Sequence, residues 1–134
     1  MIGSKANLLS LAAVVAIALT RAAVAALDGS QAQTVTVLAT EYHFSPDKLS
    51  LKRGLAYRLH LENHGRELHE FTAPEFFKSI ELGDPAVLNP DRTEILIPPG
   101  EVKDVTFVAL QTGHYRLFCA DHDWAGMIGE ITVE

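Results

Sequence analysis

The residues best suited to chemistry lie close together near the C-terminal end of the chain. Cys119 is the only cysteine, and it is followed by His122 and Met127 in the spacing Cys-x2-His-x4-Met. Thiolate and imidazole groups bind copper strongly, while a thioether is a soft, weak ligand suited to Cu(I). Structural zinc sites also use Cys and His, but usually without Met. Together the three residues favour a site for one mononuclear copper ion.

A hairpin would bring these three donors to one point. Alternating apolar and polar residues predict one strand over His114–Cys119 and another over Met127–Val133. Cys119 ends the first strand, Met127 begins the second, and His122 lies in the loop between them. A single loop can therefore wrap three side chains around one ion.

His69 is the expected fourth ligand. It shares one face of a short strand, predicted over Leu68–Thr72, with Phe71. His64 competes for this position, but it lies in a turn and is expected to face solvent. Glu70 is predicted to point away from the face of His69, so we do not expect it to be a ligand.

The rest of the chain also consists of short alternating runs separated by Gly, Pro, Asn and Asp. Seven to eight strands at this spacing predict an all-β sandwich. The remaining strands are expected over Thr34–Ala39, Lys48–Leu51, Leu55–Glu62, Thr93–Ile97 and Val102–Ala109. Residues 73–91 are the exception, and we expect an irregular excursion there with a helical turn around residues 75–80.

The first 25 residues have the layout of a secretory signal peptide. Lys5 precedes an apolar run over Leu8–Leu19, and Ala23-Val24-Ala25 offers a cleavage site. The run is shorter than the roughly 20 apolar residues that span a bilayer, and Arg21 interrupts its far end. We therefore expect a signal at 1–25, one domain at 26–134, and a periplasmic or secreted protein without stable membrane insertion after cleavage.

The charge of the mature chain narrows the classes of partner. Loss of Lys5 and Arg21 leaves nine of the 11 basic residues against 17 acidic ones, a net charge of −8. An acidic protein of this size repels nucleic acid and anionic membranes. Charged partners are expected to be basic, and we expect a monomer. Neither a phosphate-binding glycine motif nor a nucleophile elbow is present.

The chain also resembles a known family. Residues 113–119 and 127–133 resemble the C-terminal signature of cupredoxins, the plastocyanin and azurin class: a Gly-x-Tyr strand, Cys-x2-His-x4-Met, then Gly-x-Ile-x-Val. Phe44-Ser45-Pro46 and Pro99-Gly100-Glu101 match in the same order. The resemblance implies a Greek-key sandwich, an electron-carrying role and a type 1 blue copper site. Its implied ligands are His69, Cys119, His122 and Met127.

Further details follow from the resemblance. Asn63 would hydrogen-bond near Cys119 and tie the two ligand loops together, and the exposed edge of His122 would be the electron exit. Asp121 stands where plastocyanins often have Pro, and Asp123 follows His122. These carboxylates would stabilise Cu(II) or attract a basic partner.

Three functions compete. The leading one is a one-electron carrier between redox partners, such as a cytochrome or a copper oxidase or reductase. The alternative is a periplasmic copper-binding or delivery protein, or an accessory to metal uptake, which Met-rich or His-rich tracts would favour. An enzyme would need a second copper centre with additional His ligands, so we do not expect one.

Overall fold

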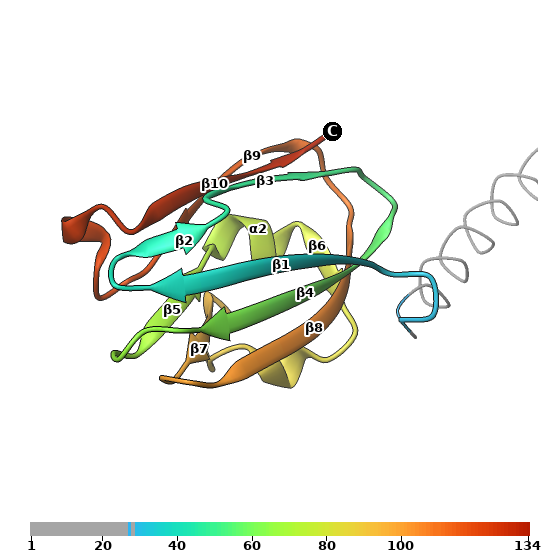
Figure 1. The fold of residues 1–134 in the computed structure, drawn as a ribbon. Coiled ribbons are helices and arrows are strands. Elements are labelled where there is room, and N and C mark those ends of the chain that lie inside the picture. The colour runs from blue at the N-terminus through green and yellow to red at the C-terminus, as the bar shows by residue number, and fades with distance from the viewer. Residues whose placement is uncertain (1–26, 28) are drawn as a thin grey trace, which may run out of the picture.

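The computed structural model describes residue 27 and residues 29–134, so the predicted signal segment, residues 1–25, lies outside the described part. Within that part, two five-stranded sheets pack face to face (Figure 1). In spatial order the first sheet contains β2 (His43–Ser45), β1 (Gln33–Thr40), β4 (Ala56–Asn63), β8 (Val102–Ala109) and β6 (Ile80–Leu82). The second contains β3 (Lys48–Leu51), β10 (Ile128–Val133), β9 (Gly113–Phe118), β5 (His69–Thr72) and β7 (Glu94–Ile97). The predicted all-β sandwich is confirmed.

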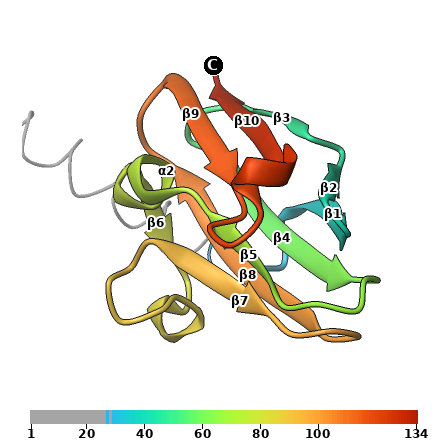
Figure 2. The same ribbon diagram turned by 90° about the vertical axis from the view of Figure 1, so that its left-hand side faces the viewer.

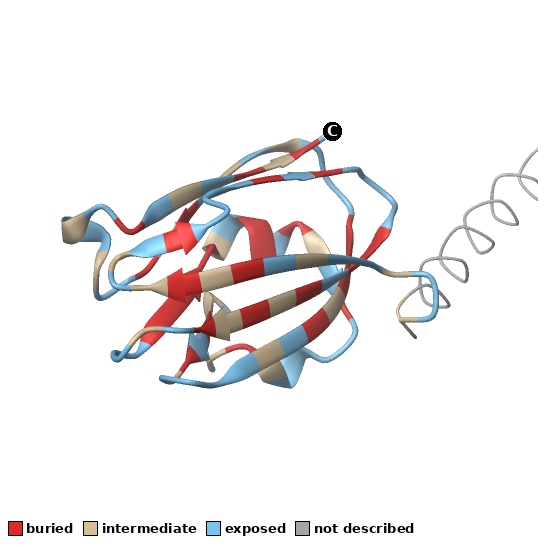
Figure 3. Ribbon diagram, viewed as in Figure 1, coloured by how far each residue is buried: buried red, intermediate tan, exposed pale blue. Residues whose placement is uncertain are grey.

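Side-chain alternation explains the two-layer packing. Along β4, Tyr57, Leu59 and Leu61 are buried, whereas Arg58 between them is exposed. Figure 3 shows buried positions alternating with intermediate or exposed ones along β1 and β4. Because successive side chains of a strand point to opposite faces, the buried set forms the core between the sheets. Each large apolar side chain removed from water contributes about 1.5–3 kcal/mol to this packing.

The connections place three loops at one end of the sandwich. The chain passes from the first sheet to the second between β2 and β3 and returns before β4, and β1 pairs in parallel with β4. The β1–β2 turn, the β4–β5 loop and the β9–β10 loop thereby meet at the left-hand end in Figure 1. In Figure 2 this end faces the viewer, with the β9–β10 loop in red and orange.

The excursion at residues 73–91 is more ordered than predicted. It contains helix α2 (Pro74–Lys78), strand β6 and the 3-10 helix η1 (Pro85–Val87). Helix α2 buries Phe76 against Phe107, with ring centroids 5.5 Å apart, and so closes one flank of the core. Strands β2 and β6 were not predicted, because three residues are too few to establish an alternating pattern.

Candidate metal site

Three of the predicted donors meet at the loop-bearing end. The Sγ atom of Cys119 lies 3.4 Å from Nδ1 of His122 and 3.9 Å from Nδ1 of His69. One donor atom from each of the three residues lies within 4.8 Å of the other two. Across the described residues, no other set of His, Cys, Asp and Glu side chains forms such a group. The spacing seen in the sequence is thus a cluster in space.

Backbone hydrogen bonds shape the loop that carries two of these donors. The N–H of Cys119 donates to the carbonyl of Met127 at 3.0 Å, and the N–H of His122 donates to the carbonyl of Cys119 at 3.2 Å. The short helix η2 (Asp123–Ala125) follows and ends at Gly126, whose φ of 87° suits glycine. The loop is therefore compact, and Met127 is fully buried at its end.

His69 comes from the opposite side of the site. It begins β5, pairs with Ile97 of β7, and is fully buried. His64, the competing candidate, is more than half exposed and binds the Glu62 carboxylate through Nε2 at 2.6 Å. The structure therefore brings His69 to Cys119 and leaves His64 in a surface contact.

Glu70, which was expected to point away from the face of His69, nevertheless contacts the site. Its side chain is buried, with Oε2 2.9 Å from Sγ of Cys119 and accepting the N–H of Asp121 at 3.2 Å. Its own N–H donates to the same sulfur at 3.4 Å. Both faces of β5 are buried, so a side chain that points away from the face of His69 still lies inside the protein. Glu70 is still not one of the three clustered donors.

The expected role of Asn63 is wrong. Its Nδ2 donates to the carbonyls of Glu67 and Ile97 at 2.8 and 2.7 Å, and its Oδ1 accepts from the N–H of Gly65 at 2.8 Å. These contacts hold the β4–β5 loop against the end of β7. The link between β5 and the β9–β10 loop comes from Glu70 instead.

The thiol of Cys119 is strongly affected by its surroundings. Burial, and then the hydrogen bond to the Glu70 carboxylate, raise the pKa of Cys119 to about 12. The metal-free protein therefore holds a protonated thiol at neutral pH. Because a thiolate is the form that binds metal, an ion entering the site must displace this proton.

The outer edge of His122 is covered rather than open to solvent. Only 12% of its side chain is exposed, and Nε2 lies 2.8 Å from Oε2 of Glu67. The Tyr42 ring packs on the imidazole with centroids 4.7 Å apart. Trp124, 77% exposed, lies beyond Tyr42 at 5.8 Å between ring centroids. The surface outside the cluster is thus formed mainly by Trp124 and Tyr42, and only a small part of the predicted His122 edge is exposed.

Sequence reasoning missed four residues around the cluster: Glu41, Tyr42, Glu67 and Glu70. The first three lie on turns and loops, where no alternating pattern indicates the direction of a side chain. The signal for Glu70 was its place beside His69, which was interpreted by strand parity alone.

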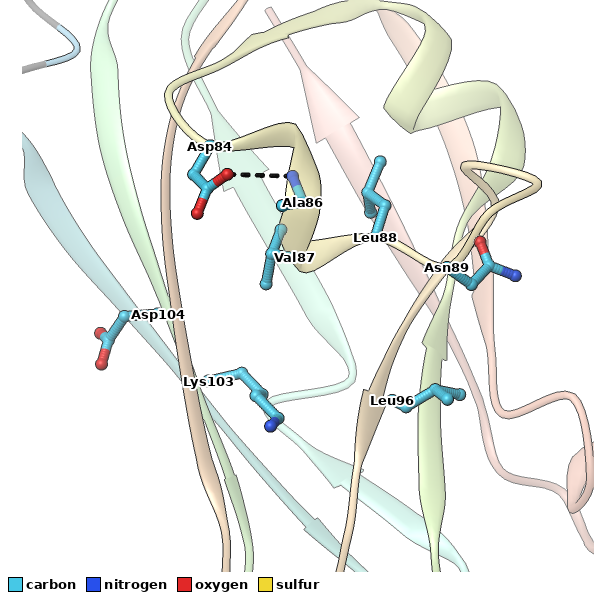
Figure 4. A pocket seen from close by; sticks show the side chains of 8 residues that line it. All are labelled: Asp84, Ala86, Val87, Leu88, Asn89, Leu96, Lys103 and Asp104. Carbon is cyan, nitrogen blue, oxygen red and sulfur yellow. Dashed lines mark hydrogen bonds between the residues drawn. The ribbon is translucent and has the colours of Figure 1, made fainter.

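An open hollow of about 360 Å³ lies elsewhere, beside η1. Figure 4 shows its lining, which consists of Asp84, Ala86, Val87, Leu88, Asn89, Leu96, Lys103 and Asp104. Asp84 accepts the N–H of Ala86 at 2.9 Å and so caps the N-terminal end of η1. None of the clustered donors lines this hollow.

Among the described residues, no helix has the length and apolar character needed to cross a membrane.

The fold and the donor cluster define a small all-β protein with a metal-binding loop at one end of its sandwich. The family model of the cupredoxin-like domain matches residues 9–133, and the chain belongs to this family. Its cofactor is one copper ion, which suits a cluster of one thiolate and two imidazoles.

Plastocyanin of Sambucus nigra is 36% identical over 50 residues, which cover 37% of this chain and 48% of the relative. The chain thus matches about half the length of this curated relative. Auracyanin B superposes with a TM-score of 0.57 at 23% identity, covering 78% of this chain and 91% of that one. A multi-copper oxidase of Pediococcus acidilactici gives a TM-score of 0.57 at 12% identity, covering 78% of this chain and 27% of that one. These two structural likenesses concern the fold alone.

Proposed function

We propose that this protein carries single electrons on one copper ion, which His69, Cys119 and His122 would hold, with Met127 as a weak fourth ligand. The main support is the position of two imidazole nitrogens: Nδ1 of His122 and Nδ1 of His69 lie 3.4 and 3.9 Å from Sγ of Cys119. Bonds of about 2.0–2.3 Å to a shared ion place neighbouring donors roughly 3–4 Å apart. A His2Cys set with a weak Met is the donor set of electron-transfer copper sites.

Electron transfer, rather than catalysis, is favoured by the completeness of this set. A catalytic metal keeps an open position for water or substrate, whereas four protein donors leave none. The donors are also held by strands and by a hydrogen-bonded loop, which limits rearrangement between the two oxidation states. Trp124 and Tyr42 offer a short path from His122 to the surface.

Copper delivery is the alternative role for the same site. It requires the ion to leave the protein easily. His69, Cys119 and Met127 are all fully buried, so the arrangement favours retention of the ion.

The remaining features of the proposal come from charge and from the N-terminal sequence. Residues 1–25 would direct export and be removed, which would place the protein in the periplasm or outside the cell. The net charge of −8 after their loss suits basic redox partners, such as a cytochrome or a copper oxidase or reductase. We expect the protein to act as a monomer.

The test is spectroscopic. Residues 26–134 are loaded with Cu(II), and visible and EPR spectra are recorded for wild type, Cys119→Ser and the control His64→Ala. We expect a thiolate-to-copper charge-transfer band in wild type and in His64→Ala, and its loss in Cys119→Ser. A wild-type protein without this band would overturn the site.

A second measurement separates the carrier from the delivery protein. Stopped-flow oxidation and reduction by a basic cytochrome is compared with transfer of Cu(I) to a chelator. A carrier exchanges electrons much faster than it releases copper. The reverse order of rates would favour delivery.

A further inference from the structure

Both imidazoles of the cluster have a carboxylate beside the nitrogen that faces away from Cys119. Nε2 of His69 lies 3.5 Å from Oε1 of Glu41, and Nε2 of His122 lies 2.8 Å from Oε2 of Glu67. In each ring the other nitrogen, Nδ1, is the one nearest the sulfur. Both histidines therefore have the same arrangement, although Glu41 and Glu67 lie on different loops.

The surroundings of His69 make the Glu41 contact significant. Its ring is fully buried, and Nε2 makes no ordinary hydrogen bond within the described part of the chain. Buried polar atoms nearly always have a partner, so this atom needs an explanation. The Glu41 carboxylate, although 3.5 Å away, is placed to accept its proton.

The Glu41 carboxylate is held in that place by the β4–β5 loop. It accepts the N–H of Arg66 in a short hydrogen bond and the N–H of Glu67 at 3.0 Å. These two donors, Arg66 first, keep the pKa of Glu41 below its usual range, so the group is charged at neutral pH. The Glu41 carboxylate thus has three contacts, two with the loop and one with His69 of β5.

Gly65 leaves the space that this arrangement needs. A Cβ atom at this position would clash with Oε1 of Glu41 and lie 3.0 Å from Nε2 of His69. The requirement is one of close approach and not of unusual backbone angle. Any larger residue would have to push the carboxylate and the imidazole apart.

Glu67 is held on His122 by a second contact. While Oε2 faces Nε2 of His122, Oε1 accepts the Tyr42 hydroxyl at 3.3 Å. The Tyr42 ring in turn covers the imidazole at 4.7 Å. Tyr42 follows Glu41 in the chain, so one turn supports both histidines, one directly and one through Glu67.

We propose that Glu41 and Glu67 are positioning residues that fix the orientation and tautomer of His69 and His122 for copper. This inference rests on the proposed copper site. A carboxylate that accepts the Nε2 proton leaves Nδ1 unprotonated and directed at the ion, and it makes the imidazole a stronger ligand. The two negative charges also favour Cu(II) over Cu(I), because the attraction grows with the charge of the ion.

The inference is tested with two kinds of substitution at each position. Glu41→Ala and Glu67→Ala remove both the acceptor and the charge, whereas Glu41→Gln and Glu67→Gln keep an acceptor of the same size. Glu62→Ala and Glu62→Gln are the matched controls, because Glu62 binds His60 and His64, which lie outside the cluster. Correct folding is checked for each variant by circular dichroism.

The first readout uses the metal-free protein. Nitrogen-15 NMR of the imidazoles reports which ring nitrogen carries the proton. We expect the Nε2–H tautomer of His69 and His122 in wild type, its loss at one ring in the corresponding Ala variant, and its recovery in the Gln variant. Unchanged tautomers in both Ala variants would overturn the inference. Where an Ala variant fails to fold, an Nδ1–H tautomer of that ring in wild type would overturn it.

The second readout is copper binding. Competition with a chelator is expected to show an approximately tenfold loss of Cu(II) affinity in Glu67→Ala and a smaller loss in Glu67→Gln. The reduction potential should rise in both Gln variants and stay at the wild-type value in Glu62→Gln. Potentials that match the control would overturn the electrostatic part.

The two proposals fail in different ways. A wild-type protein without the charge-transfer band would remove the copper site, while the NMR of the metal-free protein would still decide the role of the carboxylates. A normal band combined with tautomers that ignore Glu41 and Glu67 would remove only the positioning role.

Discussion

His69 and His122 present the same nitrogen to Cys119 from contrasting surroundings. His69 lies in a strand, paired with Ile97 across the sheet and fully buried. His122 lies in a loop, held by backbone hydrogen bonds within that loop and covered by the side chains of Tyr42 and Glu67. The first is thus placed by the packing of the sandwich, and the second by a few local contacts. Disturbing the first should therefore damage the fold, while disturbing the second should damage mainly the site.

The largest expected effect comes from truncating each histidine. His69→Ala leaves a void in a packed interior and should destabilise the metal-free protein by about 2–4 kcal/mol. His122→Ala should cost less, about 1–2 kcal/mol, since its ring is partly exposed and the side chains that cover it, Glu67 and Tyr42, lie on loops. Urea unfolding of the metal-free variants measures both. Equal losses in the two variants would contradict the comparison.

A smaller effect is expected from Gly65→Ala. The added methyl group must displace the Glu41 carboxylate, which is partly exposed and can move, at a cost of about 1 kcal/mol. The imidazole NMR signals of His69 should shift, while those of His122 should stay unchanged. The second histidine serves as the internal control, and equal shifts in both rings would show that the two sides of the site are not independent.

Trp124→Ala tests the outer side of the loop. Trp124 is 77% exposed and donates Nε1–H to the carbonyl of Asp121 at 2.8 Å, so unfolding stability should change by no more than about 0.5 kcal/mol. Electron exchange with a basic cytochrome should slow several-fold, because the contact surface outside His122 is lost. The control is Leu110→Ala, another exposed apolar residue, in the connection between β8 and β9, which Figure 1 shows at the opposite end of the sandwich. Equal rates in the two variants would contradict the role of Trp124.

The smallest effect is expected for His60, a histidine on the surface of the sheet that also contacts carboxylates. His60 binds Asp104 at 2.8 Å and Glu62 at 2.9 Å, and these contacts, Asp104 first, raise the pKa of His60 above 6.5. His64 and then His60 lower the pKa of Glu62 below 4.5.

The sign of the pH dependence follows from these two shifts. The stabilisation from His60 is present below pH 6.5 and lost as pH rises through its raised pKa. The stabilisation from Glu62 is present above pH 4.5 and lost as pH falls. His60→Gln should therefore lower stability most between about pH 5 and 6 and least in alkali, which urea unfolding across pH measures. A difference from wild type that is constant with pH would contradict this prediction.

Much of the sandwich could be predicted because its longer strands carry a clear alternation. Strands β3 and β8 have the predicted bounds, and β4 is shifted by one residue. Strands β2 and β6 contain three residues each and carry no pattern of their own. Their places depend on pairing with β1 and β8, which the local sequence does not contain.

The errors around the site have a different cause. The resemblance implied that Asn63 hydrogen-bonds near Cys119. Its Nδ2 instead donates to the carbonyls of Glu67, in the β4–β5 loop, and Ile97. Strand parity predicted that Glu70 points away from the face of His69. Parity separates core from solvent only where one face of a strand is exposed, and both faces of β5 are buried. Its contact with Cys119 joins residues 49 positions apart.

The sequence by itself determined the donors that one loop can supply, Cys119, His122 and Met127, since their spacing within nine residues limits how far apart they can lie. It also determined the sandwich, because hydrophobic alternation decides which strand faces are buried. Only the tertiary structure decided what surrounds each donor: Glu70 at the sulfur, Glu41 at His69, and Glu67 with Tyr42 at His122. These contacts join residues from separate loops, and loop side chains follow no period from which their direction could be predicted.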